Sequence, residues 1–297
     1  MKHVAVPPRA IALVVLLTLV WGTNWPLFPL AMREISVWTF RAVSVTGAGL
    51  TLLLIARMRG QSLKVPRELW PTMIWASLTY LVIWNIASAF SAILIPSGQS
   101  AVLGFTMPLW SALISWLLLG QRLTRRLVLA VLLGATSVAL LMGPALTDYA
   151  QAPAGFALGL LSGMGWAVGT LILKRRPMPL PPLVLTGWQL LIAALPIIAL
   201  AGWLGDGKWF MPSTTSIVII TYITLVPMSI GNAAWFTIVG LLPANVASLS
   251  PILVPVVAMI SGALVLGEPL GWLQLGAMAC SAGALSLALL KPRRSRL

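Results

Sequence analysis

The residues of this sequence with the clearest chemical potential are uncharged polar side chains inside apolar stretches. Asn85 and Asn232 each lie well within such a stretch. Polar groups are costly to bury in a membrane, so those present face protein or water and are candidates for binding a polar solute. The alternative is hydrogen bonding between helices, which contributes about 0.6 kcal/mol on average. For the asparagine pair both interpretations stay open.

A second group of polar residues follows prolines that can begin a helix. Gln99 and Ser100 come shortly after Pro96, and the stretch after Pro243 contains Asn245, Ser248 and Ser250. The first turn of a helix presents unpaired N–H groups and the positive end of the helix dipole, which suit a carboxylate. These residues are therefore predicted to contact a substrate. Prolines also remove backbone hydrogen bonds, so we expect hinges at Pro108, Pro251 and Pro255.

Tryptophan is frequent, with 14 in the chain. Those at the ends of apolar stretches fit the aromatic belts found at membrane surfaces. Others lie deeper, where a ring can hold an ammonium by cation–π attraction or stack on an aromatic solute. The residues predicted to line a binding cavity are Trp21, Tyr80, Trp84 and Trp166, together with Asn24 in the segment VWGTNW.

Arg41 is the one charged side chain clearly inside an apolar stretch. Its simplest roles are to snorkel toward the membrane surface or to meet Glu34, seven residues earlier. No Asp or Glu lies deep in such a stretch, although proton-coupled antiporters usually keep one. We therefore expect facilitated, gradient-driven movement of a solute rather than obligatory proton exchange.

Metal and enzyme chemistry find no support in the sequence. One cysteine, Cys280, and one histidine, His3, do not form a disulfide or a Cys/His metal cluster. Paired carboxylates and an HExxH segment, which would supply a general base or a metal site, are absent. The prediction is a protein without enzymatic activity, cofactor or metal ion.

The elements that position these residues are predicted to be membrane helices, because 59% of the residues are hydrophobic and 8% are charged. Apolar stretches of about 20 residues, the length that crosses a bilayer, occur at 10–32, 36–56, 69–90, 97–119, 126–143, 154–173, 183–203, 215–238, 244–266 and 270–290. The fold class is therefore an all-α membrane protein with ten transmembrane helices. The first stretch is too long for a signal peptide and lacks a small-residue cleavage site.

Loop charges predict the orientation of the helices. If the N-terminus is cytoplasmic, one side of the membrane collects every basic residue except Arg33, Arg41 and Lys208. The opposite loops contain most of the acids, namely Glu34, Asp148, Asp206 and Glu268. Because cytoplasmic loops are rich in Lys and Arg, we expect a multi-pass protein of a bacterial inner membrane with both termini cytoplasmic. This rule also explains the net charge of +14 without a nucleic-acid partner.

The sequence matches itself without gaps at an offset of 147 residues. The match relates predicted spans three to five to spans eight to ten and pairs Asn85–Asn232, Pro96–Pro243, Pro108–Pro255 and Gly120–Gly267. The two predicted halves, 1–147 and 148–297, contain five spans each, so the second half is inverted in the membrane. Two inverted halves that exchange conformations open a central site to each side in turn. The pattern therefore favours a transporter.

Glycines recur every four positions in the predicted span 154–173, at Gly155, Gly159 and Gly163. A stripe of small residues lets another helix approach closely. We expect this face to serve packing, because a phosphate-binding glycine loop needs a strand and a soluble helix.

Several segments resemble a known family over nearly the whole chain. VWGTNW, Phe40–Arg41, LLLGQRLT and LPANVASLSPILVPVVAMISGALVLGEPL are similar to the EamA type of the drug/metabolite transporter superfamily. The resemblance implies ten helices around a central cavity and export of amino acids, related metabolites or drugs. The tryptophan-rich pattern is most similar to exporters of aromatic and other neutral amino acids. One departure is Gln189, near the place where a second-half match for Arg41 is expected.

The function that the sequence favours is export of amino acids from the cytoplasm by alternating access. The partners are then a small-molecule substrate and the lipid bilayer, and a monomer is sufficient. The first alternative is an exporter of drugs or other metabolites with the same fold. An alternative of another class is a membrane-embedded enzyme or a receptor without transport.

Overall fold

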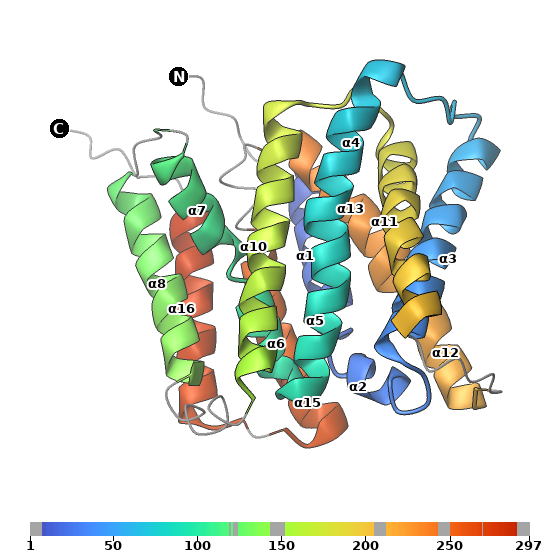
Figure 1. The fold of residues 1–297 in the computed structure, drawn as a ribbon. Coiled ribbons are helices and arrows are strands. Elements are labelled where there is room, and N and C mark those ends of the chain that lie inside the picture. Colours follow the sequence, from blue (N-terminus) through green and yellow to red (C-terminus); the bar gives the residue numbers. More distant parts are fainter. Residues whose placement is uncertain are drawn as a thin grey trace.

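The computed structural model of the chain describes residues 8–118, 120, 124–142, 152–204, 212–242, 250–268 and 270–289. Within these ranges the regular structure is entirely helical. Figure 1 shows most of the helices standing side by side, with α8 (Arg125–Met142) and α16 (Trp272–Leu289) paired at one end of the group. The predicted site residues lie within these ranges, except Asn245 and Ser248, which lie outside the described residues.

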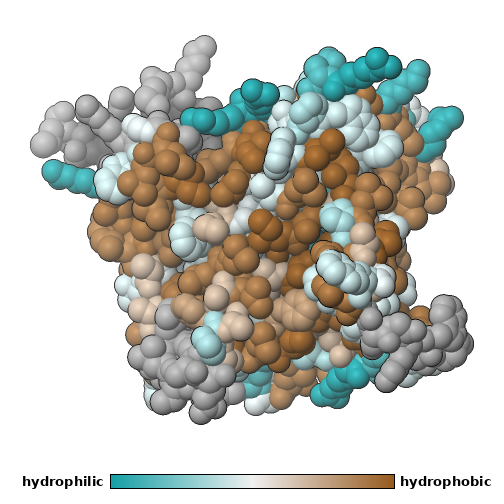
Figure 2. Space-filling model, in the orientation of Figure 1, coloured by the Kyte–Doolittle hydropathy of each residue, from teal (hydrophilic) through white to brown (hydrophobic). Residues whose placement is uncertain are grey.

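The outer surface of the molecule suits lipid. In the described part of the chain, six helices are long and apolar enough to cross a membrane: 37–58, 67–94, 97–117, 153–175, 182–204 and 214–241. Figure 2 shows a broad hydrophobic band across the middle of the visible face, with hydrophilic side chains gathered at its upper and lower ends. Leu54, Leu195 and Leu264 are more than half exposed. Such an apolar surface is stable in a bilayer and not in water.

Helices overlap all five predicted spans of the first half. They are α1 (Pro8–Gly22), α2 (Leu27–Ala31), α3 (Val37–Met58), α4 (Trp70–Ala76), α5 (Ile83–Leu94), α6 (Ser97–Gly104), α7 (Met107–Leu117) and α8. A π-helical segment, η2 (Ser77–Val82), joins α4 to α5, and a short 3₁₀ turn, η1 (Arg67–Leu69), precedes α4.

The second half has a similar series of helices. They are α10 (Pro153–Arg175), α11 (Pro182–Leu204), α12 (Thr214–Ile223), α13 (Asn232–Leu241), α15 (Val254–Leu266) and α16. A π-helical segment, η3 (Thr224–Gly231), joins α12 to α13, and a 3₁₀ turn, η4 (Ser250–Leu253), precedes α15.

In the first half, two predicted spans are interrupted rather than continuous. The stretch 10–32 is broken between Gly22 and Leu27, and 97–119 is broken at Phe105 and Thr106. Proline explains both positions, because it lacks the N–H that an α-helix needs and disfavours helical backbone in the residue before it. Pro26 ends the first break, and Pro108 lies in the first turn of α7.

The irregular segments of the two halves recur at the offset of 147 residues seen in the sequence. The π-helical segments begin at Ser77 and Thr224. After the later breaks, α7 and α15 begin at Met107 and Val254, each followed by a proline. Paired stretches of sequence therefore adopt the same local backbone.

The glycine stripe of α10 is confirmed as a face of close helix packing. A Cβ atom at Gly159 would lie 2.8 Å from Cβ of Leu103, and one at Gly163 would lie 2.7 Å from the carbonyl oxygen of Gly104. These separations are shorter than van der Waals contact, so glycine lets α10 approach α6 closely. This packing sets Trp166 of α10 in the interior, where it is 2% exposed.

Glu268 joins the end of α15 to the start of α6. Its carboxylate accepts hydrogen bonds from the backbone N of Ser97 at 3.0 Å, Oγ of Ser97 at 2.6 Å and the backbone N of Gly98 at 3.2 Å. These N–H groups have no partner within the helix, and the helix dipole favours an anion there. The N-terminus of α6 is thus occupied by a carboxylate of the protein itself.

Gly231, at the end of η3, lets Trp21 of α1 pack against it, since a Cβ atom there would overlap Nε1 of Trp21. Nε1 also donates to the carbonyl oxygen of Pro227 at 3.1 Å, which fixes the ring. We expect Gly231→Ala to destabilise the protein by about 1–3 kcal/mol, the usual effect of overpacking a core. The measurement is the melting temperature of the purified protein in detergent.

The matched control for this prediction is Gly240→Ala in α13. A Cβ atom there meets nothing within 4 Å, and alanine favours a helix over glycine by about 1 kcal/mol. The control should therefore melt at the same temperature as the parent protein or higher. Equal melting temperatures for the two variants would show that Trp21 is not held as described.

Candidate functional site

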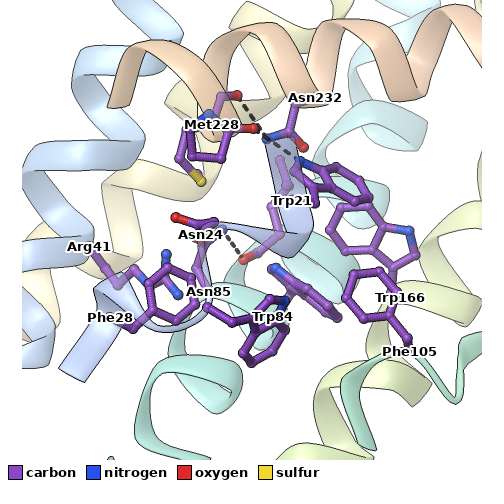
Figure 3. A pocket seen from close by; sticks show the side chains of 13 residues that line it. Trp21, Asn24, Phe28, Arg41, Trp84, Asn85, Phe105, Trp166, Met228 and Asn232 are labelled. Atoms are coloured by element: carbon purple, nitrogen blue, oxygen red, sulfur yellow. Dashed lines mark hydrogen bonds between the residues drawn. The ribbon is translucent and has the colours of Figure 1, made fainter. Parts of the chain in front are cut away.

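A cavity lies among the interruptions of the helices (Figure 3). Its empty space, together with some of the open space at its mouth, amounts to about 410 Å³. Only a small part of this space is wide enough for a water molecule, so a larger solute requires the walls to move apart. The lining residues are Trp21, Asn24, Trp25, Phe28, Arg41, Leu81, Trp84, Asn85, Phe105, Trp166, Pro227, Met228 and Asn232.

Irregular backbone supplies much of this lining. Asn24 and Trp25 come from the break after α1, and Phe105 comes from the break between α6 and α7. The π-helical segments contribute Leu81, Pro227 and Met228. Non-helical backbone at membrane depth is tolerated where it borders a cavity, and π turns often occur at functional sites. The helix interruptions therefore mark the position of the cavity.

Aromatic rings form one wall of the cavity. The ring centroid of Trp166 lies 4.8 Å from that of Trp84 and 5.4 Å from that of Trp21, both in edge-to-face arrangements. In Figure 3 these three rings and Phe105 gather on one side of the site, away from Arg41. Such a wall offers ring faces to an aromatic or cationic group.

The two repeat-related asparagines bond in the same way, each within its own chain segment. Nδ2 of Asn85 donates to the carbonyl oxygen of Leu81, and Nδ2 of Asn232 donates to that of Met228, both at 2.8 Å. The amide oxygens of both residues, and that of Asn24, are buried and accept no hydrogen bond from the residues that the structure describes. The described contacts therefore show no bond between helices for this pair. They leave three acceptors that a solute with N–H groups could satisfy.

Arg41 has neither of the two simple roles considered from the sequence. It is 1% exposed and lines the cavity, so it does not snorkel to the surface. Glu34 instead accepts a hydrogen bond from the backbone N of Ser213 at 2.9 Å, and this bond lowers the pKa of the Glu34 carboxyl. A buried guanidinium beside the cavity is therefore part of the site.

Comparison with known proteins identifies the family. The sequence model of the EamA-like transporter family matches residues 8–143 and 153–290. The chain belongs to the EamA-like transporter family. It is therefore a membrane transporter. The resemblance of its sequence to the EamA type of the drug/metabolite transporter superfamily is thus confirmed.

Relatives of this EamA-like transporter agree with that assignment. The chain is 24% identical to the uncharacterized transporter YvbV of Bacillus subtilis, over 88% of the chain and 85% of the relative. It is 27% identical to a protein of Salmonella typhimurium named probable amino-acid metabolite efflux pump, over 91% of the chain and 92% of the relative. A solved structure with 19% sequence identity superimposes with a TM-score of 0.73. The match covers 94% of this chain and 97% of the chain in that structure. That likeness shows the fold.

Several residues predicted for the site of this EamA-like transporter lie elsewhere. Tyr80 is not among the lining residues, and its hydroxyl donates to Oε1 of Gln189 at 2.7 Å while its ring packs on Trp166. Gln99, Ser100 and Ser250 are also absent from the lining. The N–H groups at the start of α6, expected to bind a substrate carboxylate, bind Glu268.

The three predicted hinge prolines lie where helices begin. Pro108 and Pro255 are in the first turns of α7 and α15, and Pro251 is in η4. Each position is an interruption of a predicted span. Movement about these interruptions stays a prediction.

Sequence reasoning missed seven lining residues of the EamA-like transporter: Trp25, Phe28, Arg41, Leu81, Phe105, Pro227 and Met228. The sequence contains a pattern that could have identified some of these residues. Trp25 and Phe28 flank Pro26, and Phe105 comes three residues before Pro108, so aromatic residues beside helix-breaking prolines could have been chosen. No comparable pattern distinguishes Leu81 or Met228 from the other apolar residues of their spans.

Proposed function

We propose that this transporter exports amino acids, chiefly aromatic and other neutral ones, from the cytoplasm by alternating access. The observation that carries the proposal is the set of unpartnered amide oxygens of Asn24, Asn85 and Asn232 beside the tryptophan wall. An ammonium group has three N–H donors and no acceptor, so it suits these oxygens and the ring faces. The rings suit an aromatic or other apolar side chain.

The transport cycle that we propose uses ten membrane spans in two inverted halves, 1–147 and 148–297, with both termini in the cytoplasm of a bacterium. The matching π-helical segments and helix starts at the 147-residue offset support two related halves. Exchange of conformation between such halves would open the cavity first to one side and then to the other. Both halves of the chain contribute lining residues, among them Trp84 and Trp166, so the proposed cycle requires no second copy of the chain.

The experiment is efflux from liposomes that contain the purified protein and are preloaded with a panel of labelled amino acids. Protein-free liposomes are the control. We expect release of aromatic and other neutral amino acids above the control rate. Release of unrelated drugs without release of any amino acid would support the rival exporter, and no release of either class would support a protein without transport.

Transport is expected to proceed without obligatory proton exchange. Among the described residues, those that line the cavity include no acidic side chain, and proton-coupled transporters usually keep such a group within their spans. An imposed pH gradient should therefore leave the rate and the final extent of amino-acid efflux unchanged. Uphill movement of an amino acid driven by a pH gradient alone, measured in the same liposomes, would contradict this prediction.

A further inference from the structure

Arg41 lies deep in the protein, and no acidic side chain among the described residues forms an ion pair with it. Its Cζ atom is 4.3 Å from the ring centroid of Phe28 and 5.0 Å from that of Phe40. Nη2 donates one hydrogen bond, to Oγ of Ser88 at 3.4 Å, and Nε is buried with no acceptor. Arginine can donate five hydrogen bonds, so most of the capacity of this guanidinium is not used by the described residues.

The acidic residues that the structure describes are engaged or located elsewhere. Glu34 binds Ser213, Glu268 caps α6, and Glu68 is exposed in the turn before α4. In the described part of the chain, the cavity lining contributes a positive charge through Arg41 and no negative charge. An uncompensated buried ion is destabilising by several kcal/mol, so a site of this kind favours an anionic group that enters the cavity.

We propose that Arg41 binds the carboxylate of the transported molecule, and that a monoanionic carboxylate is the group for which the cavity selects. This inference rests on the proposed function. The amide oxygens and the rings account for the ammonium and the side chain of the substrate, and Arg41 would account for its carboxylate. In Figure 3 Arg41 lies across the site from Trp21, Trp166 and Phe105. A carboxylate at Arg41 would leave the rest of an aromatic amino acid directed toward those rings.

The charge of the site also separates carboxylates from other anions. One guanidinium balances one negative charge, and the lining holds no second cation for a phosphate dianion. Guanidinium and carboxylate are well matched, because two parallel N–H groups can bond the two oxygens. The same reasoning disfavours lipophilic cations, because they carry no anionic group and would be repelled by the positive charge of Arg41.

A purely structural role for Arg41 makes a different prediction. Stacking between Phe28 and Phe40 could hold α2 against α3 without any ligand. In that case replacement of Arg41 would lower stability and would not alter the preference among ligands. The test therefore needs a readout of ligand preference.

The first measurement uses the unaltered protein and quenching of its tryptophan fluorescence. The ligands are phenylalanine, 3-phenylpropionate, which lacks the ammonium, and phenethylamine and phenylalaninamide, which lack the carboxylate. We expect the two carboxylates to bind more tightly than the two molecules without one, by about 10- to 100-fold for a charge-assisted contact. Inorganic phosphate should not compete. Equal affinity for phenylalanine and phenylalaninamide, or effective competition by phosphate, would overturn the inference.

The second measurement compares variants. Arg41→Gln should bind phenylalanine about 10- to 100-fold more weakly and lose the preference over phenylalaninamide, whereas Arg41→Lys should keep part of it. Arg33→Gln, the same change at an exposed arginine, should behave as the parent. Retention of the full carboxylate preference by Arg41→Gln would overturn the inference. If that variant does not fold, the ligand series on the parent protein decides.

The two proposals can fail separately. Amino-acid efflux combined with a carboxylate preference that does not depend on Arg41 would remove this inference and leave the proposed function. Binding of carboxylates through Arg41, without efflux of any amino acid, would remove the proposed function and leave this inference.

Discussion

Replacing Asn85 and Asn232 together by leucine is expected to lower amino-acid efflux by at least about 100-fold. Each substitution removes an acceptor for the substrate ammonium, and a hydrogen bond to a charged group contributes about 1.5–3 kcal/mol. Leucine has a shape similar to that of asparagine, but its side chain forms no hydrogen bonds. Each single variant should retain more activity than the pair. The measurement is the initial rate of efflux from liposomes at equal protein density.

Stability should change little in the same double variant, and this separates a substrate role from a structural one. Each leucine loses one hydrogen bond to Leu81 or Met228 but also removes a buried oxygen that has no partner. These two effects are of similar size and opposite sign, each about 1 kcal/mol. Unchanged efflux, or a large fall in melting temperature, would contradict the assignment.

Thr237→Val is the matched control for the asparagine variants. Oγ1 of Thr237 donates to the carbonyl oxygen of Ala233 at 2.7 Å, four residues earlier in the same helix as Asn232. Thr237 does not line the cavity. Its replacement therefore removes the same kind of bond without removing an acceptor from the site, and efflux should be unchanged.

Trp166→Ala is expected to reduce efflux of aromatic amino acids at least tenfold. Its ring contacts the rings of Trp21, Tyr80, Trp84 and Trp235 and joins them into one wall. Aromatic pairs contribute about 0.5–1.5 kcal/mol each beyond their buried area. Loss of the ring removes one contact to the substrate and loosens the others. Efflux rates for a panel of aromatic and aliphatic amino acids provide the measurement, with the larger loss expected for the aromatic ones.

Two further variants separate this effect from general damage to the fold. Trp166→Phe keeps a ring in the same place and should retain most of the activity. Trp75→Ala removes a tryptophan that is 65% exposed on α4, and it should transport as the parent does. Equal transport of aromatic amino acids by Trp166→Ala and the parent would refute the place of Trp166 in the site.

Features that depend on hydrophobic length and residue size were predictable from the sequence. The helical segments lie close to the predicted ranges because apolar stretches of about 20 residues have few other stable forms in a bilayer. The stripe of Gly155, Gly159 and Gly163 predicted a close helix contact because glycine has no side chain to hold a neighbouring helix away. The pairing of Asn85 with Asn232 identified two residues that the structure places at one cavity.

Features that depend on how helices meet were not predictable. Tyr80 lies one helical turn from Trp84, but tertiary packing directs its hydroxyl to Gln189 of another helix. Glu268 is far from Ser97 in the sequence, so nothing local shows that it occupies the start of α6. The burial of Arg41 beside Phe28 likewise depends on the bend between α1 and α2, which the span pattern does not show.

The central claim is that one cavity opens in turn to each side of the membrane and binds amino acids. It can be tested by labelling Met228→Cys, a lining position, in a chain whose single cysteine is changed by Cys280→Ser. A thiol reagent that does not cross membranes is applied to whole cells and to inverted vesicles. The account predicts labelling from both sides, slowed in both cases by an aromatic amino acid. Labelling from one side only, with no effect of amino acids, would contradict it.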